Sequence, residues 1–448
     1  MAKTERIQSM TQGRPAKLIF TFAIPLMLGN VCQQLYTVVD TAIVGQALGA
    51  ADWLNWLVLG VIQGFAQGFS IHMAQRFGAN DEEGLNRSIG ATISIAAAFS
   101  VLLLIVSQAT MDPILRAMNT PEEVIGGAFT YLRIMFAGIP IIMAYNVLAS
   151  ILRALGDSRT PLYAMLIASV LNIALDLLFV MVFHWGIAGA VIATVIAQLF
   201  AALYCLRAVL RIRIIRLKKA YFLPDPVLAR RLLGLGLPVA AQNMIIAIGG
   251  MVVQSVVNRY GVLFVAGFTA TNKLYGILEI AATSFGYAVT TYVGQNLGAG
   301  LLGRIRKGMH AATWIALLTS AVITAAVLLL GRFMVALFIS GTPEEVALST
   351  DVAVHYLNIM RICLSVLYML HIYRSALMGL GDTVMPMASG IVEFVMRIGV
   401  ALILPAFLGQ EGIYYAEVVA WAGAAILLVA TYFVRMKKLE RELPSAEK

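Results

Sequence analysis

Twelve apolar stretches constrain the fold of this 448-residue chain more than any other feature. Each is close to the roughly 20 residues that an α-helix needs to cross the hydrocarbon core of a bilayer. The predicted membrane-spanning segments are 17–44, 53–76, 88–109, 127–152, 160–182, 186–208, 232–257, 270–294, 308–330, 351–374, 385–407 and 412–434. We therefore expect an all-α polytopic membrane protein.

Composition and charge support the same class. Hydrophobic residues make up 60% of the chain and charged residues 12%, against about 25% charged in soluble proteins. With the polar N-terminus inside, 25 of the 32 Lys and Arg residues fall in cytoplasmic segments, which is the positive-inside bias. The net charge of +9 thus indicates topology rather than nucleic-acid binding. Residues 1–13 lack the apolar core of a secretory signal.

Three short motifs of the first half recur in the second half. The pairs are Thr120–Val124 with Thr342–Val346, Leu155–Asp157 with Leu380–Asp382, and Gln75–Ala79 with Gln295–Ala299. Such self-similarity is typical of duplicated transporter folds. Six spans per half place both halves in the same orientation, as parallel repeats that can rock about a shared cavity. We expect a six-helix lobe at 1–210, a basic linker at 211–231 and a second lobe at 232–448.

The linker is strongly basic between residues 211 and 219 and contains Pro224 and Pro226. It is consistent with an amphipathic stretch on the anionic inner leaflet or with a solvated cytoplasmic connection. The sequence leaves both alternatives open.

The duplication breaks down at two carboxylates. Asp40 and Asp176 lie inside apolar segments, and the corresponding positions of the second half are Val253 and Ala401. An ionisable group at such a depth costs about 3 kcal/mol, and no Lys or Arg lies three or four residues from either carboxylate. Two carboxylates in one apolar pocket cannot both ionise cheaply, so the pair is suited to binding a proton.

Polar residues lie within five of the first six spans, and on four of these spans they follow helical spacing. They include Asn30, Gln33, Thr37 and Asp40; Gln63, Gln67 and Ser70; Tyr145 and Asn146; Ser169, Asn172 and Asp176; and Thr194 and Gln198. One economical arrangement turns these stripes toward a hydrated pocket, and the alternative is hydrogen bonding between helices. In such a pocket the oxygens of Asn172 and Thr194 would also suit Na⁺. The sequence does not choose between the two ions.

Charged residues of the second half have potential partners. Glu393 and Arg397 lie at i and i+4 on one predicted helix and can pair there. Glu279 is expected either to pair with Arg361 of another span or to attract a cationic substrate. We expect no catalytic chemistry and no cofactor, because the chain lacks nucleophile and zinc motifs and its three Cys are scattered.

The chain resembles the multidrug and toxic compound extrusion (MATE) family. The resemblance runs from about Lys17 to Arg435 and is carried by Pro25, Val39–Gly45, Leu155–Pro161, Asn172–Asp176 and Gly294–Ala299. It implies a twelve-helix exporter of two six-helix lobes, and we expect the protein to be a monomer. Such an exporter moves cationic or amphipathic small molecules out of a bacterial or archaeal cell in exchange for H⁺ or Na⁺. The resemblance also implies a cytoplasmic-membrane location with both termini inside.

The resemblance further assigns residue roles. One branch of the family couples transport in the N-terminal lobe, at positions that correspond to Asp40, Asn172, Asp176 and Thr194. In that lobe Tyr36 and Asn146 match further lining positions, and Pro25 matches a helix-bending proline. We expect the cavity to be lined by Tyr36, Gln33, Thr37, Gln63, Gln67, Asn146, Glu279 and Arg361.

N-lobe coupling and drug export each have one alternative. The tenth span carries Arg361 and no deep carboxylate, which disfavours coupling in the C-terminal lobe, although Glu279 keeps that alternative open. The runner-up function is a flippase for lipid-linked sugars. The chain has few deep basic residues for a pyrophosphate, notably Arg361 and Arg397, and this disfavours the flippase.

Overall fold

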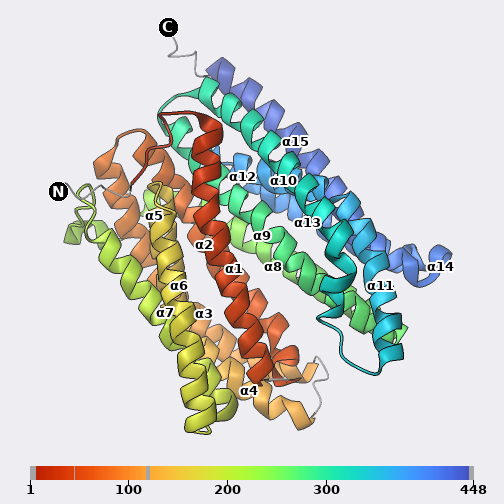
Figure 1. Cartoon of the computed structure of the whole chain (residues 1–448). Helices are drawn as coiled ribbons and strands as arrows, with labels where there is room; N and C mark the ends of the chain where they lie inside the picture. The colour runs from red at the N-terminus through yellow and green to blue at the C-terminus, as the bar shows by residue number, and fades with distance from the viewer. Residues whose placement is uncertain (1–6, 45, 118–121, 443–448) are drawn as a thin grey trace. The chain divides into compact units, whose positions relative to one another are not determined.

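A computed structural model of the chain describes residues 7–44, 46–117 and 122–442, and within them the side chains of 7–34, 54–116 and 124–442. Every regular element of these residues is a helix (Figure 1). The first half contains α1 (Pro15–Val44), α2 (Gln46–Gly78), α3 (Glu82–Ala117), α4 (Glu122–Ala137), α5 (Ile139–Ala154), α6 (Arg159–Asp176), the π-helix η1 (Leu177–Val182) and α7 (Gly186–Val209).

A short 3₁₀ turn, η2 (Lys219–Phe222), lies in the connection to the second half. That half contains α8 (Pro226–Val257), η3 (Asn258–Tyr260), α9 (Val262–Gly298), α10 (Leu302–Ala336), α11 (Pro343–Ile362), α12 (Leu364–Gly379), α13 (Val384–Ile403), α14 (Pro405–Leu408), η4 (Gly409–Tyr414) and α15 (Tyr415–Glu442).

The described helices account for the twelve expected membrane crossings. Eight segments are long and apolar enough to cross a membrane, and two bent helix pairs raise this number to ten. One of the eight, Val384–Glu442, contains both α13 and α15. Counting these two separately gives eleven, and α9, which is not among these segments but is 37 residues long, brings the number to twelve. The all-α polytopic fold predicted from the sequence is confirmed.

The bent pairs occupy the fourth span of each half. The α4–α5 pair bends by 51° and the α11–α12 pair by 52°. The stretch 127–152 had been expected as one helix, and it breaks at Gly138, one residue before α5. Pro140 lies at the start of α5, where its missing N–H removes a backbone hydrogen bond that a continuous helix would need. The duplication is therefore visible in the shape of individual spans.

The described chain divides into two compact units. Unit 1 comprises residues 1–12, 24–244 and 294–299, and unit 2 comprises 13–23, 245–293 and 300–448. Three of the five limits between the units thus fall inside helices, in α1, α8 and α9. The domain limits expected from the sequence, with a boundary at 211–231, stay a prediction.

Unit 1 is built around α2, which packs against α3, α4 and α5. Its core contains the buried rings of Phe65, Phe69 and Phe136. On another face, small residues let α2 approach α8 closely. A Cβ added at Gly64 would lie 2.6 Å from Cα of Ala240. This is the packing by small residues that is common between membrane helices, where burial of apolar surface supplies little driving force.

Unit 2 packs α15 against α12 and α13, and α10 against α11 and α12. The outer face of α10 is apolar. Leu329 is 81% exposed and Phe333 is 68% exposed. A contiguous apolar surface of this kind would be costly in water, whereas it is the expected surface of a helix facing lipid.

The repeated Leu-Gly-Asp motifs form the same local structure twice. Gly156 and Gly381 each follow a helix with φ of +84°, a conformation that side chains with a Cβ rarely adopt. The next residue then caps the following helix. Asp157 Oδ1 accepts from the backbone N of Thr160 at 2.9 Å, and Asp382 Oδ1 accepts from that of Met385 at 3.2 Å. The motif therefore encodes a helix–turn–helix corner.

The other repeated motifs are also structural. Thr342 and Glu345 form a reciprocal capping box at the start of α11. The first copy of that motif begins outside the described residues. In unit 1, Oε1 of Gln295 accepts a hydrogen bond from the backbone N–H of Met10 at 2.8 Å. Its Nε2 donates a hydrogen bond to the carbonyl of Ala154, also at 2.8 Å. Gln295 thereby connects the N-terminal residues to α5 and α9.

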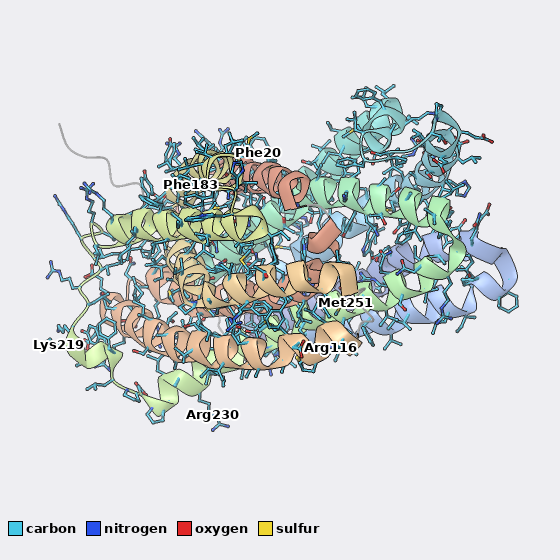
Figure 2. All side chains as sticks on the ribbon, turned by 90° about the horizontal axis from the view of Figure 1, so that it is seen from below. Phe20, Arg116, Phe183, Lys219, Arg230 and Met251 are labelled. Atoms are coloured by element: carbon cyan, nitrogen blue, oxygen red, sulfur yellow. The ribbon has the colours of Figure 1, made fainter. Side chains whose placement is uncertain are left out.

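The basic linker is held against α3 by two hydrogen bonds between Asn86 and the linker backbone. Asn86 Oδ1 accepts from the backbone N of Arg216 at 2.6 Å, and its Nδ2 donates to the carbonyl of Ile214 at 2.8 Å. Residues 212–218 form no α-helix. Their apolar side chains, Ile212, Ile214, Ile215 and Leu217, pack against the core of unit 1. Basic side chains between them are exposed, and the side chain of Lys219 points away from the ribbon (Figure 2).

Candidate functional site

A buried polar cluster connects α6 and α7 within unit 1. Asn172 of α6 is 1% exposed, and its Nδ2 donates to Oγ1 of Thr194 on α7 at 3.2 Å. The Thr194 hydroxyl in turn donates to the carbonyl of Ala190 at 3.1 Å. Ser169, one turn before Asn172, is also buried and donates to the carbonyl of Met165 at 2.8 Å. The sequence had predicted that Asn172 and Thr194 share a site.

The amide oxygen of Asn172 makes this cluster more than a helix–helix hydrogen bond. It is buried and has no hydrogen-bond partner among the described residues. Leaving a buried acceptor unsatisfied costs about 1–3 kcal/mol. An oxygen in this situation is a ready ligand for a cation or a ready acceptor for a hydrogen bond.

Asp176 lies one helical turn beyond Asn172, and its side chain is completely buried. It is the last residue of α6, and the π-helix η1 follows at once. Single π-turns inside membrane helices are rare and are frequent at functional sites. Periodicity in the sequence predicted the shared face of Asn172 and Asp176, but no sequence signal indicated the π-turn.

The remaining candidate residues of the N-terminal lobe fall into two groups, those whose side chains the structure does not describe and those that differ in exposure. The side chains of Tyr36, Thr37 and Asp40 lie outside the described residues. Gln63 is exposed, and Gln33 and Gln67 are half-buried.

The structure also describes two further predicted positions, Asn146 and Pro25. Asn146 donates to the carbonyl of Ile142 on its own helix at 2.9 Å. Pro25 lies inside α1, which is continuous on both sides of it.

In unit 2, Glu279 of α9 pairs with a residue that sequence reasoning missed. Its Oε1 lies 3.1 Å from Nε2 of His371 on α12, and the two side chains are 30% and 14% exposed. The expected alternative, a pair between Glu279 and Arg361, is wrong. The Nε of Arg361 is instead buried without a hydrogen-bond partner among the described residues. An isolated histidine carries no motif, so nothing in the sequence marked His371 as the partner.

A chain of four charges, of which three are buried and Glu417 is partly buried, lies beside this pair in unit 2. Arg374 of α12 is ion-paired with Glu393 of α13, and Arg397 of α13 is ion-paired with Glu417 of α15 at 2.8 Å. Glu393 and Arg397, predicted to pair along one helix, are 3.9 Å apart, so each has a closer partner on another helix. The prediction of a helical pair thus gives way to a ladder across three helices. Alternating signs leave the four groups with no net charge.

The fold matches solved structures of membrane transporters. One is described as the outward-facing conformation of a multidrug resistance MATE family transporter of the MOP superfamily. It is 24% identical, with a TM-score of 0.90, and the match covers 96% of this chain and 98% of that one. This likeness shows that the chain has a polytopic, two-lobed, twelve-helix α-helical membrane fold.

The family follows from the sequence comparisons. The MatE family model matches residues 25–178 and 238–403, and the chain belongs to this family. "Probable multidrug resistance protein YpnP" of Bacillus subtilis is 32% identical over 412 residues, which are 90% of this chain and 91% of that protein. "Probable multidrug resistance protein NorM" of Thermotoga maritima is 25% identical, over 87% of this chain and 85% of that protein. The resemblance to the MATE family stated from the sequence is confirmed.

Proposed function

We propose that this MATE family transporter is a secondary active antiporter. It exports cationic or amphipathic small molecules in exchange for H⁺ or Na⁺ by alternating access. The names of its relatives, which are multidrug resistance proteins, support the substrate class. The partly exposed carboxylate of Glu279 is a suitable contact for a cationic substrate.

The observation that carries the proposal is the burial of Asp176 beside the Asn172–Thr194 pair. A carboxylate in an apolar span persists when it binds something, and a transporter binds its coupling ion at such a position. Protonating Asp176 would remove its charge. Alternatively, Na⁺ would gain carboxylate and amide oxygens that prefer hard cations. Asp40 completes the proposed site, as the family resemblance implies.

The proposed topology places both termini in the cytoplasm of a bacterium or archaeon and the chain, as a monomer, in the cytoplasmic membrane. The basic linker supports this orientation because positive charge stays on the cytoplasmic side. The flippase alternative is not favoured. Two of the deep arginines of unit 2, Arg374 and Arg397, are neutralised by glutamates and are not available to a pyrophosphate.

The test uses the purified protein in proteoliposomes with a fluorescent cationic dye, under separately imposed H⁺ and Na⁺ gradients. The gradient that drives uptake into inverted vesicles identifies the ion. Asp176→Asn and Asp40→Asn each keep a polar side chain of similar size and are expected to abolish ion-driven transport. Asp112→Asn, which removes an exposed carboxylate from α3, is the matched control. Ion-driven transport that persists in both variants would refute the proposed coupling site.

A further inference from the structure

A surface groove on α6 and α7 has the length of one lipid acyl chain. Its volume is about 740 Å³. The apolar lining residues are Ile167, Phe200, Leu203, Leu206 and Leu210, and the others are Tyr204, Arg207 and Arg211. Phe200 to Leu210 spans ten residues, or about 15 Å of helix. That is half of the ~30 Å hydrocarbon core, the thickness of a single leaflet.

The groove is open to the surroundings rather than filled by the protein. Leu203 is 51% exposed, and Leu210 is 64% exposed. In a membrane protein such a hollow is covered by lipid, so its polar end determines which lipid fits best.

The polar end of the groove carries only positive charge. Arg207 and Arg211 lie at i and i+4, at the end of α7 and just beyond it. Neither guanidinium makes a hydrogen bond or ion pair within the described part of the chain, and no acidic residue lines the groove. Guanidinium groups bind phosphate oxygens in bidentate geometry. Two of them one turn apart, at the level where a span ends, match the position of a lipid phosphate.

The linker fixes this polar end in place. It begins at Arg211 and is held to α3 through Asn86. A headgroup bound by Arg207 and Arg211 would therefore connect the α6–α7 surface to the clamped linker.

We propose that this groove is a binding site for an anionic phospholipid of the leaflet on the linker side. One acyl chain lies along the α7 face from Leu210 toward Phe200 and Ile167, and the phosphate sits between Arg207 and Arg211. The site is separate from Asp176 and Glu279, so it does not depend on the proposed coupling mechanism. It rests on the chain's being a membrane protein, which its family establishes.

The test is native mass spectrometry of the purified full-length protein, titrated with phosphatidylglycerol or phosphatidylcholine of the same acyl chains. The wild type is expected to bind phosphatidylglycerol at least about tenfold more tightly, since each basic residue adds roughly a factor of five toward an anionic lipid. The double variant Arg207→Gln/Arg211→Gln is expected to lose this preference.

Two further variants separate a groove from diffuse charge attraction. Lys219→Gln/Arg230→Gln removes the same charge from exposed positions that do not line the groove (Figure 2), and it is expected to keep the preference. Leu203→Trp fills the groove, leaves both arginines, and is expected to weaken binding of phosphatidylglycerol severalfold. Equal loss in the two double variants, or unchanged binding by Leu203→Trp, would overturn the proposal.

Discussion

Gly78 at the end of α2 lies directly against the backbone of Gln295 in α9, within unit 1. A Cβ added at Gly78 would overlap the carbonyl oxygen of Gln295, and a Cβ added at Gly298 would overlap that of Gln75. The glycine of each copy of the repeated motif thus packs directly against the backbone of the other copy. This reciprocal contact is the physical reason why both copies need glycine at this position.

We expect Gly78→Ala and Gly298→Ala each to reduce the yield of folded, monodisperse protein severalfold. In both cases backbone, rather than a flexible side chain, would have to move. The measurement is size-exclusion chromatography of detergent extracts. Gly399→Ala, in α13, is the matched control, because nothing lies within 4 Å of its added Cβ. There the change should be neutral or should gain up to ~1 kcal/mol of helix stability. Normal yield of both Gly78→Ala and Gly298→Ala would contradict this account.

Thr194→Val tests the hydroxyl at the proposed coupling site. Valine keeps the shape but removes the oxygen that accepts from Asn172, so ion-driven transport should fall at least about tenfold. The free energy of unfolding should change by only about 1 kcal/mol. Thr431→Val removes a comparable hydroxyl, which donates to the carbonyl of Leu427 at 2.8 Å, and should leave transport intact. If the two variants transport equally in proteoliposomes, Thr194 has no coupling role.

The partly exposed Glu279 carboxylate predicts selective binding of cationic ligands. It lies 3.1 Å from Nε2 of His371. The nearby cations Arg374 and Arg397 are paired with Glu393 and Glu417 and do not neutralise it. Glu279→Gln should therefore weaken the binding of a cationic dye about tenfold.

Fluorescence anisotropy of the dye measures this binding. Glu279→Gln should leave the binding of a neutral ligand unaffected, because only a cation gains from the carboxylate. His371→Gln keeps a hydrogen-bonding side chain beside Glu279 and should change dye binding by less than about threefold. Equal loss of the cationic and the neutral ligand in Glu279→Gln would rule out this role.

The buried charge ladder of unit 2 should be sensitive to loss of a single member. Glu393→Gln leaves Arg374 without its ionic partner and is expected to cost about 3–5 kcal/mol of unfolding free energy. Asp112→Asn removes a partner from the exposed Asp112–Arg116 pair and should cost less than about 1 kcal/mol. Thermal unfolding in detergent compares the two variants. Similar midpoints would show that the ladder adds nothing to stability.

Local sequence patterns predicted most of the fold and part of the candidate site. Apolar length predicted the membrane spans, because a bilayer imposes one length on every helix that crosses it. Helical spacing placed Asn172 and Asp176 on one buried face, since residues four apart share a face whatever surrounds the helix. The repeated Gly156 and Gly381 were recognisable because a turn with positive φ selects glycine locally.

Only the tertiary structure decided which charges meet. The sequence predicted an ion pair between Arg397 and Glu393 on one helix. In the structure, Glu417 of α15 lies closer to Arg397 than Glu393 does. Glu279 pairs with His371 and not with Arg361. Spacing along one helix fixes a residue's direction, whereas pairing across helices depends on how those helices pack. The sequence by itself therefore determined a duplicated, twelve-span membrane protein with buried carboxylates. The packing of α9, α12, α13 and α15 determined the partners of the charges in unit 2.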